Sequence, residues 1–376
     1  MRALALLAAL LLLVPLGARG ETLAGAIDQT VDGLDLSALE AALQEDSPFA
    51  ATGGLRETLR ALARGEITLS FDELAALVTT RFFGAVKTSL WRLTRLMAPA
   101  LIWSILKHLS GKGAEAGKCA CSLMVCVFLA RDLTDHATLC SQTVSRMSDG
   151  MQGLFPVLLT LMTALGGSAG SALMQPAVVA ASGAITGLIH NVTLPLALAS
   201  AMLTMLCHLG EGVKVSRLAG LIRQLASWSL GISFTAFIGV LATRGLTASA
   251  VDGITIRTAK FALDNFVPVV GGLFADTVDT LVGSALLVQS ALGVTGLMAL
   301  IAYALTPLCQ TLAAALLYRL AAALLQPVAD GELAGCIHDF SGVLMLLFVI
   351  QLCAAAMFVM LIAQLVAVSS MTVMLR

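Results

Sequence analysis

Charged side chains and helix-breaking residues are concentrated in residues 260–280 of a chain that is otherwise strongly apolar. Lys260 and Asp264 are four residues apart, so on a helix they lie on the same face and can form an ion pair. Asp276 and Asp279 share one face of a following helix. Carboxylates within a membrane usually face a water-filled cavity, where they couple ions or relay protons. These residues are therefore the first candidates for chemistry.

The backbone between these charges is interrupted. Pro268 and the Gly271-Gly272 pair are expected to end one helix and begin another. Two arrangements fit this pattern: an external connector with solvated charges, or a re-entrant element at 251–280 that lines an aqueous cavity, where irregular backbone is tolerated. The candidate motif comprises Lys260, Asp264, Asn265, Pro268, Gly271, Gly272, Asp276 and Asp279.

Other site chemistries have weaker support in the sequence. The Gly-Lys pairs at 111–112 and 117–118 lack the preceding glycine of a nucleotide-binding P-loop, so any ATPase must be a separate partner. None of the five histidines has a metal-ligand spacing, and we expect no metal and no cofactor. Ser168 lies in a G-x-S-x-G match, which marks a nucleophile only on a strand–turn–helix. An intramembrane serine protease that pairs Ser168 with His208 is the least favoured alternative.

The composition indicates a membrane protein. The 376 residues are 58% hydrophobic and 12% charged, with a mean hydropathy of +0.93. Soluble domains are nearer one quarter charged. The formal net charge of −1 gives no basic field for nucleic acid. We predict an all-α, polytopic membrane protein without enzymatic activity.

The N-terminal region has the features of an exported segment. Residues 1–20 are predicted to form a signal peptide, in which Arg2 precedes an apolar stretch. Small residues at its end predict cleavage after Gly20. The alternative is a signal anchor that is not cleaved. Residues 21–92 are predicted to be extracytoplasmic and helical, and one of their helices is expected at 55–64, where Gly65 ends it. Within them, 71–92 predicts an amphipathic helix, either on the membrane surface or packed on other external helices.

Residues 93–376 form the predicted transmembrane domain, with six to nine spans. The candidate spans are 93–109, 119–131, 151–170, 177–190, 192–209, 228–243, 281–305, 308–325 and 341–369. Lysine and arginine excess places the loops at 107–118 and 210–227 inside the cell. The acidic loop at 326–340 is predicted outside, and the C-terminus inside.

Small residues and cysteines complete the pattern. Gly166 with Gly170, and Gly183 with Gly187, form G-x-x-x-G pairs that let helices pack closely, within one chain or in a homo-oligomer. Of the eight cysteines, two fall in predicted external loops, Cys140 and Cys336, and no bridge between them can be deduced.

The run KFALDNFVPVVGG at 260–272, followed by DTVDT at 276–280, resembles stage III sporulation protein AE of endospore-forming Firmicutes. The signal, the short external region and the polytopic domain are also similar. The resemblance implies a mother-cell membrane protein that faces the forespore. It implies a role in a channel or secretion-like complex with other membrane subunits, a separate ATPase and a forespore membrane partner across the intermembrane space. A stand-alone ion-coupled transporter that uses Asp264, Asp276 or Asp279 is the alternative.

Overall fold

The computed structural model describes residues 23–37, 54–66, 71–107, 112–164, 168–207, 215–266, 271–327 and 331–374. Within these ranges the chain is helical, with short turns and no strand, so the protein is all-α as the sequence predicts. The elements are α2 (Leu23–Asp32), α4 (Leu55–Ala63), α5 (Phe71–Lys107), α6 (Lys112–Ala164), α7 (Ser168–Leu188), η2 (Ile189–Thr193), α8 (Leu194–Cys207), α9 (Ser216–Phe266), α10 (Gly271–Leu325) and α11 (Gly331–Met374).

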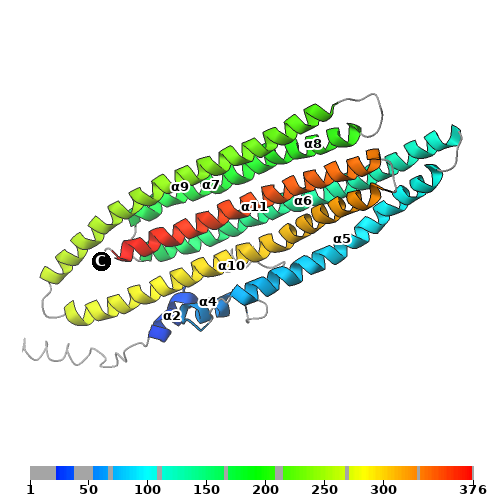
Figure 1. Cartoon of the computed structure of the whole chain (residues 1–376). Helices are drawn as coiled ribbons and strands as arrows, with labels where there is room; N and C mark the ends of the chain where they lie inside the picture. The colour runs from blue at the N-terminus through cyan, green and yellow to red at the C-terminus, as the bar shows by residue number, and fades with distance from the viewer. Residues whose placement is uncertain are drawn as a thin grey trace, which may run out of the picture.

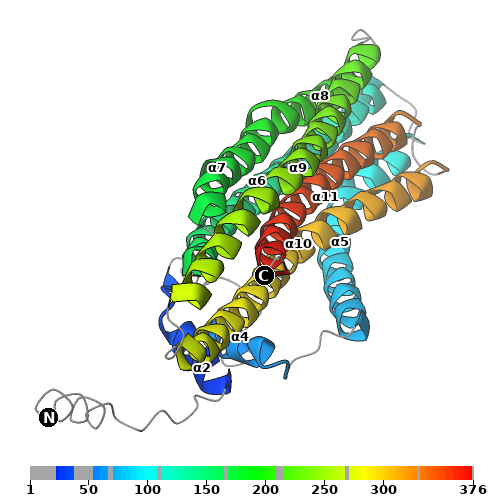
Figure 2. The same ribbon diagram turned by 90° about the vertical axis from the view of Figure 1, so that its left-hand side faces the viewer.

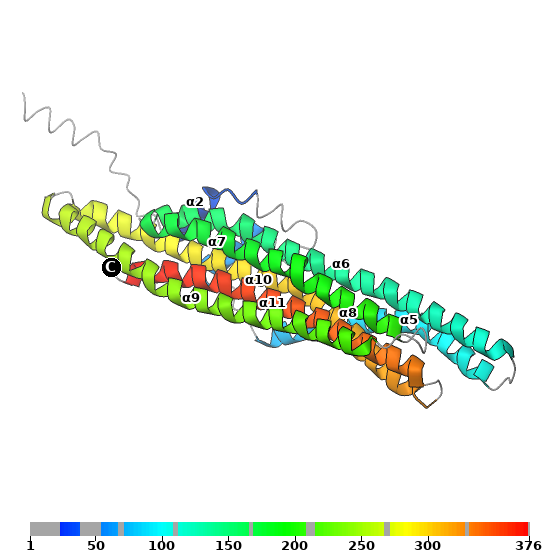
Figure 3. The same cartoon turned by 90° about the horizontal axis from the view of Figure 1, so that it is seen from above.

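The long helices lie side by side in an elongated antiparallel bundle (Figure 1). Helix α10 has 55 residues and is therefore about 80 Å long at ~1.5 Å per residue. Helix α11 is the central element, because it packs against α10, α6, α9, α8 and α7 (Figure 2). The view from above shows that α2 lies toward one end of the bundle (Figure 3), and α4 lies beside α2 in Figures 1 and 2. We call this end of the bundle the N-terminal end, and the opposite end, where α6, α9 and α11 begin, the basic end.

The two short N-terminal helices are joined by ion pairs and rest on α10. Arg64, the residue that caps the C-terminal end of α4, lies 2.6 Å from Asp28 of α2, and Arg60 of α4 pairs with Asp32. The predicted helix at 55–64 with a glycine stop is confirmed, because Gly65 has a φ of +73° that favours glycine. Its N–H and that of the next residue bond back to the carbonyls of Leu62 and Ala61, which closes the helix end.

Helix α5 contains the predicted amphipathic segment at 71–92 and continues without a break to Lys107. One side of this segment packs against α10, where Ala85 is buried beside Cys309 and Ala313. Large apolar side chains on its other side are exposed, including Phe83 and Trp91. The segment therefore packs as a helix on the bundle, and its outer side remains apolar.

Four helices are long and apolar enough to cross a membrane, counted over the described residues and by length and composition only. They are Val178–Cys207, Ser216–Ala242, Gly283–Leu325 and Leu333–Val366. A single copy of a protein with such helices would expose large apolar surfaces to water if it were not in a membrane. Together with the helical architecture, they define a polytopic α-helical membrane protein.

Several predicted span boundaries are absent. The predicted span at 119–131 and residues 151–164 of the next one lie in the single helix α6, and the predicted spans at 281–305 and 308–325 lie in α10. Pro156 and Pro307 occur inside these helices. Proline removes one backbone hydrogen bond but does not end a helix whose neighbours support it, as in many membrane helices. The break expected at residue 191 is instead the π-helical turn η2, which joins α7 to α8.

The continuity of α10 changes the predicted arrangement of the loops. Helix α10 ends and α11 begins at the basic end, as do the helices that flank 107–118 and 210–227 (Figure 1). The prediction that 326–340 lies on the opposite side from those two loops therefore differs from the structure. The predicted spans divide α10 at Pro307 and therefore count one membrane crossing too many. This extra crossing reverses the predicted side of the membrane for all residues that follow. Helix α11 accordingly ends at the N-terminal end, not opposite to it.

The two cysteines expected in external loops are buried in helices. Cys140 is fully buried in α6, and Cys336 is 3% exposed in the first turns of α11. Both are free thiols. The thiol within hydrogen-bonding reach of Cys336 is that of Cys126, on α6. The loop assignment arose because the predicted spans are shorter than the helices: the span at 119–131 ends before Cys140, and the span at 341–369 begins after Cys336.

Candidate functional site

The predicted motif forms the end of a helical hairpin. Lys260, Asp264 and Asn265 lie in the last turns of α9, and α9 ends at Phe266. Helix α10 begins at Gly271 and carries Gly272, Asp276 and Asp279 in its first turns. Pro268 is outside the described residues, and so are the side chains of 243–282. The interruption predicted around Pro268 therefore coincides with the change from α9 to α10.

This hairpin lies at the N-terminal end, where the start of α10 also contacts α2 and α4. The hydroxyl of Thr30 on α2 lies 3.4 Å from that of Ser284 on α10. Helices α9 and α10 then diverge, because α11 packs between them (Figure 2). The motif is thus carried by two long helices, α9 and α10, at the end of the bundle where α10 contacts the N-terminal helices. It is the first of two groups of polar residues that are candidates for a functional site.

Of the predicted packing glycines, Gly183 and Gly187 do not lie at close helix contacts. A Cβ at Gly183 would meet nothing within 4 Å, and one at Gly187 would meet only Asn191 in the next turn, at 3.8 Å. Gly166 is outside the described residues; for Gly170, only its place in α7 is described. The close approaches occur at Gly293 and Gly296 of α10, where a Cβ would overlap the side chains of Val366 and Leu154. The signal in the sequence that could have identified these glycines is the three-residue spacing of Gly293, Gly296 and Ala299 within an apolar helix.

The serine of the G-x-S-x-G match begins a helix and does not follow a strand. Ser168 is the first residue of α7, and the helix that precedes it is α6. The residues between the two helices and His208 are outside the described part. The strand–turn–helix that gives this motif its nucleophile is not formed by the described elements, so the match carries no argument for an enzyme.

A second group of polar residues lies where α6 meets α5 and α10, and it includes both buried and exposed side chains. Tyr318 of α10 donates a hydrogen bond from its hydroxyl to the carboxylate of Asp132. Asp135, one helical turn further, lies 3.9 Å from Arg92 of α5. His136 is 4% exposed, and neither ring nitrogen has a hydrogen-bond partner among the described residues. Sequence reasoning missed this group because it treated α6 as two short spans with a loop between them.

Helix α6 is also linked by polar contacts to η2 and α11. The imidazole Nε2 of His190 lies 3.4 Å from the hydroxyl of Ser141 and 3.3 Å from its carbonyl oxygen. Cys140 faces Gln351, a fully buried amide in the middle of α11. The π-turn, which is often found at functional positions, is what turns His190 toward α6. Polar groups on α6 thus reach four neighbours: α5, α10, α11 and η2.

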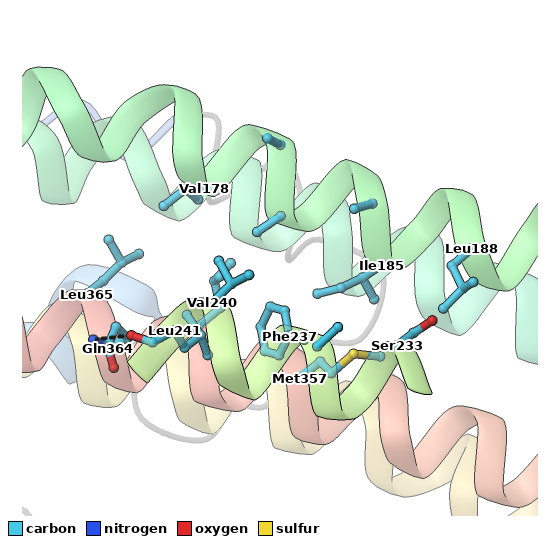
Figure 4. A pocket seen from close by; sticks show the side chains of 15 residues that line it. Val178, Ile185, Leu188, Ser233, Phe237, Val240, Leu241, Met357, Gln364 and Leu365 are labelled. Carbon is cyan, nitrogen blue, oxygen red and sulfur yellow. Dashed lines mark hydrogen bonds between the residues drawn. The ribbon is translucent and has the colours of Figure 1, made fainter. Parts of the chain in front are cut away.

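An apolar cavity inside the bundle has a volume of about 490 Å³. It lies between α7 on one side and α9 with α11 on the other (Figure 4). Ile185, Phe237 and Met357 are among the side chains that face it. Ser233 and Gln364 are the polar residues of its lining, and the Gln364 amide donates a hydrogen bond to the carbonyl of Leu241 at 3.4 Å. All three walls belong to candidate membrane spans, so this cavity suits apolar contents rather than water.

The bundle, its apolar spans and its internal polar contacts define a polytopic membrane protein of an all-α class. A family model for stage III sporulation protein AE matches residues 54–369, and the chain belongs to this family. Stage III sporulation protein AE of Bacillus subtilis (strain 168) is 33% identical over 236 residues, which cover 63% of this chain and 59% of that protein. The match thus spans less than two thirds of its relative. No solved structure matches this fold.

Proposed function

We propose that this protein is the multi-pass membrane subunit of a channel or secretion-like complex that joins the mother cell to the forespore and is needed after engulfment. Its membership of the stage III sporulation protein AE family carries the proposal and supports a role in sporulation. The recognised motif at 260–280 lies at a helical hairpin, which is a suitable place for a contact with other subunits. No residue is assigned a catalytic role.

We infer an orientation with the basic end in the cytoplasm. The loops at 107–118 and 210–227 each carry three lysines or arginines against one glutamate, which favours the cytoplasmic side. The N-terminal end would then face the space between the two membranes, in agreement with the predicted export signal. Under this orientation the C-terminus lies on that same side, in place of the cytoplasmic position predicted from the sequence.

Each end of the bundle then has a different class of partner. The N-terminal end, with α2, α4 and the α9–α10 hairpin, would face a forespore membrane partner across the intermembrane space. The basic end would face a separate ATPase, since the sequence contains no P-loop. The exposed apolar side of α9, with Leu221, Trp228 and Ile232, is available to lipid, to other membrane subunits or to a second copy.

The decisive experiment is deletion of the gene in its own host, followed by complementation. We expect sporulation to stop after engulfment while vegetative growth is normal, and the full-length gene to restore spores. Normal spore yield in the deletion strain would contradict the proposal. Purified protein in liposomes separates the alternatives: ion-driven uptake without any partner would favour a stand-alone transporter. Loss of complementation by Ser168→Ala, with normal protein level, would favour a protease.

A further inference from the structure

A polar pocket of about 180 Å³ lies at the basic end, between the first turns of α9, the last turns of α10 and the first turns of α11. Arg223 of α9, Arg319 of α10, and His338 with Asp339 of α11 contribute to its lining. Its polar lining contrasts with that of the apolar cavity near the middle of the bundle. Two arginines from different helices therefore converge on one small space.

Arg223 is held in place on one side only. Its Nη2 donates a hydrogen bond to the carbonyl oxygen of Asp339 at 3.2 Å. Its Nε is buried and has no hydrogen-bond partner among the described residues. A guanidinium has five N–H donors in a fixed plane, and a buried donor without a partner is costly. The donors of Arg223, which lines the pocket, are therefore not all satisfied by the described residues of the protein.

Gly342 makes room for this guanidinium. A Cβ at position 342 would lie 3.0 Å from Nη1 of Arg223, which is closer than ordinary van der Waals contact. The glycine thus allows the arginine to lie directly against α11. This close fit keeps the guanidinium at the pocket rather than in solvent, and it gives the pocket a defined shape.

The charges of the pocket favour an anion. Two permanently charged arginines face a single carboxylate, Asp339. Planar guanidinium groups bind phosphate oxygens in pairs of hydrogen bonds. The pocket also lies at the outer ends of three candidate membrane spans, and basic pockets between membrane helices on the cytoplasmic side commonly bind lipid head groups. The volume of the pocket is too small for a lipid chain, but it is large enough for one phosphate group.

We propose that this pocket binds a phosphate group, either in the head group of an anionic phospholipid or as free inorganic phosphate. Arg223 and Arg319 donate hydrogen bonds to its oxygens, and Asp339 limits its affinity by repulsion. The site is independent of the sporulation role proposed above, because its test measures binding by the purified chain.

The test uses the full-length protein in dodecyl maltoside, with thermal unfolding and native mass spectrometry as readouts. Phosphatidylglycerol, phosphatidylcholine and sodium phosphate are titrated separately. Arg319→Gln and Arg223→Gln are compared with Arg217→Gln, a control that removes the same charge from an exposed position in the first turn of α9, outside the pocket. Arg319 is exposed, so its variant tests binding even if the Arg223 variant is poorly folded.

We expect each pocket variant to weaken binding about tenfold or more, as loss of a charged hydrogen bond implies, and Arg217→Gln to behave as the wild type. Asp339→Asn should bind more tightly. Stabilisation by phosphatidylglycerol alone identifies a lipid head group, and stabilisation by sodium phosphate as well identifies free phosphate. Equal stabilisation by phosphatidylcholine, or pocket variants that bind as well as Arg217→Gln, would overturn the proposal.

Discussion

Tyr318 of α10 donates a hydrogen bond from its hydroxyl to the carboxylate of Asp132 of α6, although the two residues are 186 positions apart in the chain. Tyr318 also packs edge-on against Phe340 of α11, with ring centroids 5.1 Å apart. One side chain thus connects three helices, by a polar contact on one side and an aromatic contact on the other. Such a residue fixes how the helices lie relative to one another.

Replacing Tyr318 with Phe should keep the aromatic contact and remove the hydrogen bond. The half-buried carboxylate of Asp132 would then lose a donor, and we expect a loss of about 1–3 kcal/mol in the free energy of unfolding. Thermal or denaturant unfolding in detergent measures the change. Asp132→Asn and the double variant complete the cycle, since coupled residues are not additive. If the losses in the free energy of unfolding of the two single variants add up to that of the double variant, the hydrogen bond contributes nothing to stability.

The contact between Cys126 and Cys336 predicts a specific cross-link between α6 and α11. A variant that keeps only these two cysteines should form an intramolecular disulfide with a mild oxidant. A protease site introduced between residues 208 and 214 makes the link visible, because the two fragments stay joined until they are reduced.

The matched control keeps Cys140 and Cys336 instead. Cys140 is fourteen residues further along α6 than Cys126, about 21 Å at ~1.5 Å per residue, so this pair should not cross-link. Efficient cross-linking of the control pair would show that α6 and α11 are packed in a different register.

Gly296 should not accept a larger side chain. A Cβ there overlaps Leu154 of α6, which is 1% exposed and cannot move into open space. We expect Gly296→Val to destabilise the bundle by about 1–3 kcal/mol through overpacking. Gly183→Val on α7 is the control, because a Cβ there meets nothing within 4 Å. If unfolding temperatures fall equally in both variants, the close approach of α10 to α6 is wrong.

The proposed orientation predicts which positions an impermeant thiol reagent can reach. In a background without native cysteines, Ser37→Cys at the N-terminal end should react in intact cells. Ser216→Cys and Gly331→Cys at the basic end should react only after permeabilisation. All three positions are exposed in the structure. Opposite behaviour of positions 216 and 331 would restore the sequence-based assignment, in which the loop at 326–340 lies outside.

The motif at the α9–α10 hairpin should matter for function but not for membrane insertion. Asp264→Ala, Asp276→Ala and Asp279→Ala are expected to lower spore yield in a complementation assay while the protein level stays normal. Asp252→Ala, on α9 outside the recognised run, serves as the control. Full complementation by all three motif variants would remove these carboxylates from the candidate site.

The sequence was informative wherever a feature is local. Gly65 and the interruption at Pro268 were predicted because a helix end depends on a few neighbouring residues. Helix continuity through Pro156 and Pro307 was not predictable in this way, because packing against neighbouring helices decides whether a proline ends a helix. The contacts of Tyr318 join segments 186 residues apart, and no spacing rule within one helix reveals them.

The central place of α11 has a consequence for how the protein is made. Helix α11 follows α6, α7, α8, α9 and α10 in the chain, and it packs against all five of them. These helices leave the ribosome before the element that fills the space between them has been made. Domains generally form as their residues emerge, so this bundle must remain partly assembled in the membrane until α11 has been synthesised. Insertion of α11 is therefore the step that completes the packing of the bundle.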